Sequence, residues 1–335
     1  MADPAALSLV YLDHNVLDSM LKGRLRHIKN RFDGERTVAV YSQVNFREIA
    51  RSAGHEGAFL DLLQAIGARY LVSLVDDEFA PTGQAEVRIA DPHEAYLAHL
   101  RTLAESPKGD FGLGAILLKF YDGHGDVSYK EILTRGKQEL LDMLRRAAED
   151  SQNDPTLHPA QREHLAAVLA DLQPRAEVAY GVTMDLLEAQ SQQVSMHAFE
   201  DGTGLRPLYL NNVTPPGVVA KVWQRFKAAV PGCEVDLETL LHLKSTPWSA
   251  HPDREPTVME KVNAVYHALN FLGYFRDTDM KDERGFHRSF SDMTHAGMAS
   301  FCHVLQTADN RMARKAQAAY EYLNVATRVQ YLPPK

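Results

Sequence analysis

The sequence predicts an α/β fold, a three-layer sandwich whose parallel sheet is split by a large, all-helical insertion. Short apolar runs alternate with helical periodicity over residues 1 to 78, which is typical of parallel α/β sheets. The same alternation returns over residues 286 to 335, whereas residues 79 to 285 have mostly helical periodicity. We therefore expect one domain of four or five strands made from both chain ends, interrupted by the insertion.

The first segment predicts the order strand, helix, strand, helix, helix, strand. Residues 8 to 13 form a short apolar run, which favours a buried strand but also fits a piece of helix. Residues 37 to 42 are rich in β-branched side chains and predict the second strand. Ser42 can cap the helix that follows, and Gly54 can end it. The segment RYLVSLVDD predicts the third strand.

The insertion predicts a series of helices separated by stretches rich in Pro, Gly, Asn and Asp. One helix would extend from residue 158 to 199, longer than a usual globular helix, so we expect Pro174 to interrupt it. The candidate helices are 93 to 105, 111 to 121, 129 to 149, 158 to 199, 216 to 229, 236 to 244 and 256 to 272. The last segment predicts a helix at SDMTHAGMASF, a strand at CHVLQT, another helix, and a strand at ATRVQYL.

Composition limits the class of protein. The formal net charge is −8, with the acidic excess in residues 79 to 285, which argues against a nucleic-acid coat protein. Cys233 and Cys302 are too few for a disulfide framework or a cysteine-rich zinc site, and they fit a reducing cytosol. The first residues lack a signal-peptide pattern, and no apolar run is long enough to span a membrane. We expect a cytoplasmic protein without a membrane partner.

Four carboxylates are expected to meet at one edge of the sheet. Asp13 closes the first strand and Asp309 follows CHVLQT, while Glu48 lies in the helix after the second strand and Asp292 starts a later helix. Ligands of parallel sheets sit at the carboxyl ends of the strands. Crowded carboxylates repel one another unless a cation neutralises them, and Mg²⁺ and Mn²⁺ prefer such oxygen ligands. Each acid alone also fits a plainer role, as a helix cap or a solvated side chain.

The segments VYLDHNVLD, NFREIAR and SDMTHAGMASFCHVLQTADNRM resemble the motifs of PIN and PIN-like domain nucleases. In that family an Asp closes the first strand, a Glu lies in an early helix, an Asp opens a later helix, and Thr-x-Asp closes the next strand. The resemblance covers the two chain ends and says nothing about the insertion, which is far longer than the compact toxin-type members carry.

The resemblance implies a phosphodiesterase that depends on Mg²⁺ or Mn²⁺ and acts on nucleic acid, more often RNA. Asp13, Asp292 and Asp309 would be metal ligands, directly or through water, and Glu48 would bind a second ion or position the attacking water. Three further residues would have supporting roles. Asn15 and Thr307 would orient the ligands, and His295 would contact substrate phosphate or hydrogen-bond an acidic ligand. His295 equally fits an ordinary helix histidine.

Basic residues near these acids are candidates for substrate binding. Those that flank the carboxylates in sequence are Arg47, Arg51, Arg288 and Arg311. A dense basic cluster without an acid follows the first strand and includes Lys22, Arg24 and Arg26. Both sets could bind a nucleic-acid backbone, but the first could instead pair with the acids and the second could be a solvated helix face.

Three classes of function remain open from the sequence. The leading one is a metal-dependent endoribonuclease, such as a toxin-like or defence nuclease whose activity is held in check. A second is a non-catalytic module that keeps a PIN-like fold, and a third is a DNA nuclease or phosphatase that uses the same acids. The insertion could gate access or bind a regulatory protein or ligand, and a homo-oligomer stays open.

Overall fold

The structure, a computed structural model, describes residues 7–77, 80–105, 112–123, 125, 127–189, 195–245 and 253–333. The chain divides into two compact units, each assembled from separate stretches of sequence. The first comprises Met1–Ala104, Thr203–Thr278 and His287–Lys335, and the second comprises Glu105–Gly202 and Asp279–Phe286.

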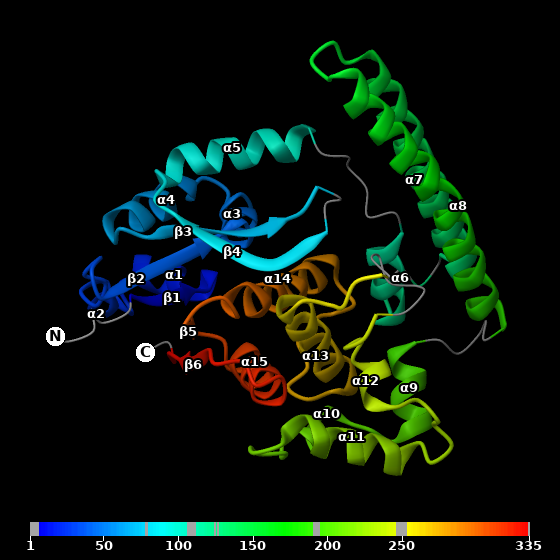
Figure 1. Cartoon of the computed structure of the whole chain (residues 1–335). Helices are drawn as coiled ribbons and strands as arrows, with labels where there is room; N and C mark the ends of the chain where they lie inside the picture. The colour runs from blue at the N-terminus through cyan, green and yellow to red at the C-terminus, as the bar shows by residue number, and fades with distance from the viewer. Residues whose placement is uncertain are drawn as a thin grey trace. The chain divides into compact units, whose positions relative to one another are not determined.

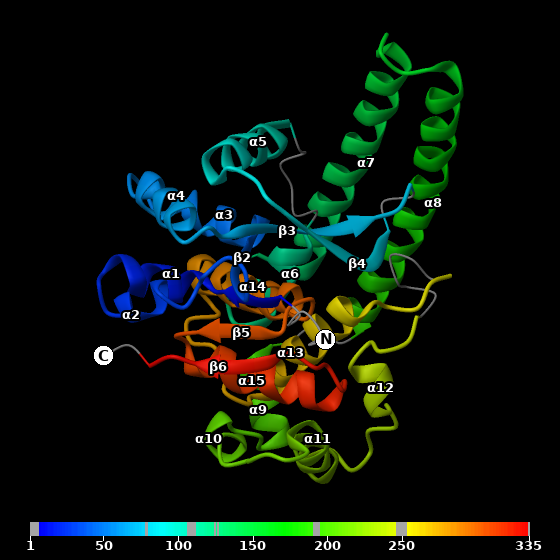
Figure 2. The same ribbon diagram turned by 60° about the vertical axis from the view of Figure 1, so that its left-hand side comes forward.

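The first unit is built on a six-stranded sheet with the strand order β4-β3-β2-β1-β5-β6 (Figures 1 and 2). Its strands are β1 Ser8–Leu12, β2 Thr37–Ser42, β3 Arg69–Val75, β4 Pro81–Arg88, β5 Val304–Thr307 and β6 Arg328–Tyr331. Neighbouring strands are parallel except for β3 and β4, which are antiparallel. The predicted α/β class is therefore confirmed, and the sheet is parallel except at its β4 edge.

The central position of β1 brings the two ends of the chain together. It pairs with β2 on one side, where Val10 lies opposite Ala39, and with β5 on the other, where Leu12 lies opposite Gln306. The carboxyl ends of β1, β2 and β5 consequently meet at one edge of the sheet, and chain direction across the sheet reverses at β1, where ligands of open α/β sheets bind.

Strand β4 falls in the segment that the sequence analysis gave to the helical insertion. Its side chains are mostly exposed, so it lacks the buried apolar run that marks the inner strands. It is an edge strand that turns back on β3, with Leu71 opposite Val87. Prediction from apolar runs finds buried strands more readily than exposed edge strands, which explains the missing sixth strand.

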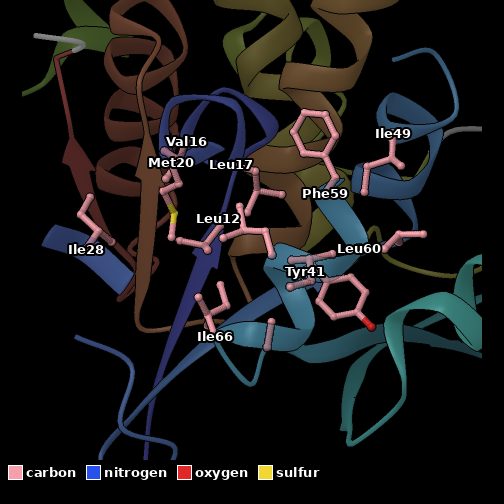
Figure 3. Packing of buried hydrophobic residues seen from close by; sticks show 14 of the residues in the cluster. Leu12, Val16, Leu17, Met20, Ile28, Tyr41, Ile49, Phe59, Leu60 and Ile66 are labelled. Atoms are coloured by element: carbon pink, nitrogen blue, oxygen red, sulfur yellow. The ribbon is translucent and has the colours of Figure 1, made fainter. Parts of the chain in front are cut away.

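Helices cover both faces of the sheet. On one face Leu12 and Tyr41 pack with side chains of α1 to α4, as Figure 3 shows. On the other face Tyr11 points toward α14 and hydrogen-bonds His295. The helices of this unit are α1 His14–Leu21, α2 Arg26–Lys29, α3 Gln43–Ile49, α4 Glu56–Ala65, α5 Pro92–Glu105, α10 Pro207–Leu210, α11 Val218–Ala229, α12 Leu237–Leu240, α13 Val258–Leu272, α14 Glu283–Ala299 from residue 287 onward, and α15 Asn310–Tyr322.

The compact units do not follow the predicted insertion boundaries of 79 and 285. Residues 80–104 and 203–278, which lie within that range, belong to the first unit with the sheet. Pairing of β4 with β3 accounts for the first stretch, and packing of α13 against α15 accounts for part of the second.

The second unit is helical. Its longest elements, α7 Tyr129–Asn153 and α8 Pro159–Ala189, are joined by a short turn and pack along each other, and the unit also holds α6 Leu113–Phe120 and most of α9 Met196–Thr203. A capping box between Ser128 and Glu131 starts α7. The prediction that Pro174 interrupts the second long helix was wrong, since α8 continues through it. In the described part of the chain, no helix combines the length and apolar character needed to cross a bilayer.

Helix α14 begins earlier than predicted. Its predicted start is Ser291, whereas the helix extends from Glu283, so Asp292 lies in its middle and cannot act as its N-cap. The polar stretch ERGFHRSF has no run of apolar residues, yet Phe286 and Ser289 are buried and hold this first part in the fold. The Asp292 carboxylate is therefore not used to cap this helix.

The core under β1 supplies a test of this packing. Leu17 of α1 is fully buried against the sheet, and truncation of a buried Leu leaves a cavity that the surroundings fill only in part. We expect Leu17→Ala to lower the free energy of unfolding by about 2–5 kcal/mol in chemical denaturation. The control Leu97→Ala removes a side chain that is 53% exposed and should change it by about 0.5 kcal/mol or less. Equal effects would contradict the core assignment.

Candidate functional site

Asp13 occupies the edge of the sheet where β1 ends. It is 1% exposed and caps α1 by accepting a hydrogen bond of 2.7 Å from the backbone N–H of Val16. Its other oxygen accepts a 2.5 Å hydrogen bond from the hydroxyl of Thr307, at the end of β5. The same hydroxyl accepts from the backbone N–H of Asp309, whose side chain in turn caps α15 at Met312. Thr307 thus links Asp13 to the turn that holds Asp309.

Glu48 is held by a chain of buried polar groups that begins on β1. The Tyr11 hydroxyl lies 2.8 Å from His295 Nδ1 and 2.7 Å from the Ser42 hydroxyl. The opposite nitrogen, His295 Nε2, lies 2.8 Å from Glu48 Oε2. Burial raises the pKa of Glu48, but the charge and hydrogen bond of His295, with His14 and Arg51, outweigh it and lower the pKa. His295 therefore keeps Glu48 in place and ionised.

Asp292 has fewer hydrogen-bond partners than the other three acids. It is 5% exposed, and among the described residues its carboxylate forms no hydrogen bond or ion pair. Burial raises its pKa well above the ordinary value, and the charges of Asp277, Asp309 and Glu48 raise it further. A group in this state needs a positive charge nearby to ionise.

The predicted acids are therefore brought together, and we call Asp13, Glu48, Asp292 and Asp309 the acidic centre. Each acts electrostatically on at least one other: Glu48 on Asp13, and both Glu48 and Asp309 on Asp292. Burial raises the pKa of Asp13 to about 6, and the charge of Glu48 adds to this against the hydrogen bond from Thr307. Desolvation and like charge together produce such shifts, which cluster at functional sites.

Sequence reasoning missed two charged residues beside the acidic centre. Lys315 of α15 is fully buried, and its Nζ lies 2.7 Å from Asp277 Oδ1. Burial lowers the pKa of Lys315, while the charges of Asp277, Asp292 and Asp309 act in the opposite direction. A lysine in the sequence RMARK suggests a solvated helix face, so only the apolar spacing of Met312, Ala316 and Ala319 around it could have indicated burial.

The predicted basic residues separate into two groups. Arg51 Nη2 donates to the Ser291 hydroxyl at 3.0 Å, beside Asp292, and Arg288 is exposed on α14 one turn before Asp292. Arg311 is exposed in the first turn of α15 and reaches the Thr278 hydroxyl at 3.3 Å. These three are placed near the acidic centre.

For one group of the remaining candidates, the main chain leads away from the acidic centre. Lys22, Arg24 and Arg26 follow the far end of α1, which leads away from Asp13 over about 12 Å toward the start of β2. The charge of Arg47 is felt by Tyr70 and His99. Asn15 is exposed in the first turn of α1.

The donor chemistry of the acidic centre fits a hard divalent cation, although the side chains are not gathered round one point. In the part of the chain that is described, no three Asp, Glu, His or Cys side chains lie close enough together to share an ion. Internal partners hold Glu48 and Asp13 to the protein.

Two buried polar atoms nevertheless lack a hydrogen-bond partner at this centre in the described residues. They are the Tyr266 hydroxyl, which feels the charges of Asp13, Asp292 and Asp309, and His14 Nδ1, which lies 4.0 Å from Glu48. Buried polar atoms without partners are costly, so unpartnered atoms beside crowded carboxylates indicate a place for a polar or charged ligand.

Comparisons with protein-family models, with curated proteins and with solved structures find no match to this chain.

The raised pKa of Asp13 gives a pH-dependent stability. An unfolded Asp loses its proton near its ordinary pKa of 3.8, whereas the pKa of Asp13 in the folded chain is raised to about 6. The folded state binds more protons in this window, so ionised Asp13 costs stability as pH rises through it. In EDTA, the free energy of unfolding of Asp13→Asn relative to the parent should increase by about 2–3 kcal/mol between pH 4 and pH 7.

Denaturant titrations at each pH measure this difference. Asp18→Asn, in the same helix and partly exposed beside Lys22, is the control for loss of a carboxylate. A difference between Asp13→Asn and the parent that stays constant with pH would show that Asp13 ionises freely.

Proposed function

We propose that this protein is a metal-dependent phosphodiesterase that cleaves RNA. The observation that carries the proposal is the acidic centre, in which carboxylates from both chain ends meet at the carboxyl edge of β1 and β5, with Asp13 and Asp292 buried. Buried acids that raise one another's pKa destabilise a fold, so a protein retains them where their charge is used. The resemblance of the surrounding segments to PIN-like nuclease motifs supports the proposed nuclease function.

Asp13, Asp292 and Asp309 are the residues proposed to hold Mg²⁺ or Mn²⁺, with Glu48 next to them. Such an ion, when bound, lowers the pKa of a bound water and stabilises negative charge on phosphorus oxygens. Carboxylates suit it because hard cations prefer oxygen ligands. The free Asp292 carboxylate and the Tyr266 hydroxyl are the groups with capacity left for new contacts.

Positioning falls to the residues that hold the acids. Thr307 fixes one oxygen of Asp13, so the opposite oxygen, which caps α1, keeps a defined direction. His295 fixes Glu48 through Nε2 and is itself fixed by Tyr11 through Nδ1. Such outer hydrogen bonds orient the groups that bind a metal or a water.

Arginine side chains at the rim supply the means to bind a phosphate backbone. Arg51, Arg288 and Arg311 are exposed. Arg51 follows the helix that carries Glu48, Arg288 lies on the helix of Asp292, and Arg311 lies in the first turn of the helix that Asp309 caps. Guanidinium groups bind phosphate oxygens in pairs, and they place a phosphodiester over the acids. A DNA substrate or a small phosphate ester would use the same contacts, so the assay below includes both.

We expect metal-dependent cleavage that requires the acidic centre. The parent should cut a pool of structured RNA with Mn²⁺ or Mg²⁺ and fail to cut it in EDTA. Asp13→Asn and Asp292→Asn should each lower the cleavage rate by about 100-fold or more. Loss of a residue that only supports a metal ligand lowers activity by about 10- to 100-fold, and loss of a ligand should cost at least as much. Both should retain the circular dichroism spectrum of the parent, because Asn keeps the shape of the side chain.

Asp18→Asn is the matched control and should cut like the parent, since its carboxylate pairs with Lys22 on the surface of α1. Single-stranded DNA and a phosphate monoester are assayed in parallel. Full activity in both acidic-centre variants would overturn the site, and preferred cleavage of DNA would replace RNA as the substrate.

A further inference from the structure

Lys315 forms a buried polar cluster with residues that neither the sequence motifs nor the proposed catalysis uses. Its ammonium group lies 2.7 Å from Asp277 Oδ1 and 2.8 Å from Asn270 Oδ1. It also lies 4.5 Å from the centre of the Tyr266 ring, over the electron-rich face. The carboxylate, the amide oxygen and the ring face all stabilise a positive charge, so these three neighbours favour a cation at this point.

The anion of this cluster is held just as firmly. Asp277 Oδ2 accepts a 2.6 Å hydrogen bond from the hydroxyl of Ser289, which lies three residues before Asp292 in α14. The backbone N–H of Asp277 donates to Asn270 Oδ1, which also accepts from Lys315. With these contacts Asp277 has little freedom to turn toward another ligand.

The cluster lies against the acidic centre. The charge of Lys315 lowers the pKa of Asp292 against the effect of burial, and Asp292 and Asp309 in turn act on Lys315. On another side of the centre, His295 holds one oxygen of Glu48, Oε2. Asp13, Asp292 and Asp309 remain to hold an ion, and the unpartnered Tyr266 hydroxyl lies within reach of their charges.

We propose that Lys315 takes the place of a second metal ion, so that the acidic centre binds a single divalent cation. This inference rests on the proposed metal-dependent function. A two-metal centre needs carboxylates that bridge ions about 4 Å apart. Here both oxygens of Asp277 are committed, one to the ammonium group and the other to the Ser289 hydroxyl, so the carboxylate that would face a second ion is already occupied.

The test counts bound Mn²⁺ by isothermal titration calorimetry on the full chain. The parent should bind one ion. Lys315→Met frees Asp277 beside Asp292 and should bind two, since a divalent ion now compensates the charge that the lysine supplied. The double variant Lys315→Met with Asp277→Asn removes both partners and should return to one. Arg314→Met, an exposed neighbour on α15, controls for net charge and should match the parent.

A second variant guards against loss of folding in Lys315→Met. Asp277→Asn leaves the lysine uncompensated next to the centre, so its repulsion should weaken Mn²⁺ binding by about tenfold or more. An ion pair with only a structural role would leave Mn²⁺ affinity unchanged in this variant. Melting in EDTA establishes that each variant is folded before titration.

The outcomes separate this inference from the proposed function. Two ions in the parent, or an Asp277→Asn variant with parent affinity, would overturn the role of Lys315 and leave the metal-dependent function standing. A single ion in a folded Lys315→Met variant would do the same. No bound ion in the parent would overturn the proposed function and this inference with it.

Discussion

The hydrogen bond from Thr307 to Asp13 joins residues 294 positions apart in the sequence. It forms because β1 and β5 are parallel neighbours with Leu12 opposite Gln306, which brings their carboxyl ends level. The backbone N–H of Asp13 donates to the carbonyl of Gln306 at the same place. Much of the site follows from this junction, because β5 leads directly to Asp309 and α15, and α15 carries Lys315.

Charge at this edge is balanced by side chains from two helices. His295 of α14 compensates Glu48, Lys315 of α15 compensates Asp277, and Asp13 and Asp292 are left with raised pKa values. Removing one member of a buried pair leaves an uncompensated charge, which costs more than the pair contributes. The balance therefore makes the acidic centre sensitive to single substitutions.

Local patterns were enough to predict the central strands and the acids that follow them. The apolar runs of β1, β2 and β5 end at Asp13, Ser42 and Thr307, and parallel pairing determines where their ends lie. The exposed β4 and the polar start of α14 were not predicted, because neither has an apolar run and both are stabilised by contacts distant in sequence. Asp292 was predicted as the first residue of a helix, but this helix begins at Glu283 and Asp292 lies in its middle.

Lys315 and Asp277 could not be found from local patterns, since their pairing joins α15 to the segment before α14. A basic residue in a helix is most often solvated, and its burial depends on what packs on that face. His295 was named as a residue that could bind an acid, but its second contact, to Tyr11 on β1, required the register of the sheet.

Helix N-termini contribute to the balance but cannot complete it. Asp13, Ser42 and Asp309 cap α1, α3 and α15, so three helices begin at the edge where the acids meet. The partial positive charge of a helix N-terminus contributes about 0.3–1 kcal/mol to a nearby anion and acts mainly within its first turn. Ionised Asp13 alone costs about 2–3 kcal/mol, and Asp292 lies in the middle of its own helix. Helix N-termini alone therefore do not offset the cost of ionising these acids. A buried ammonium group supplies further positive charge on one side, and the proposed metal ion would supply it on the other.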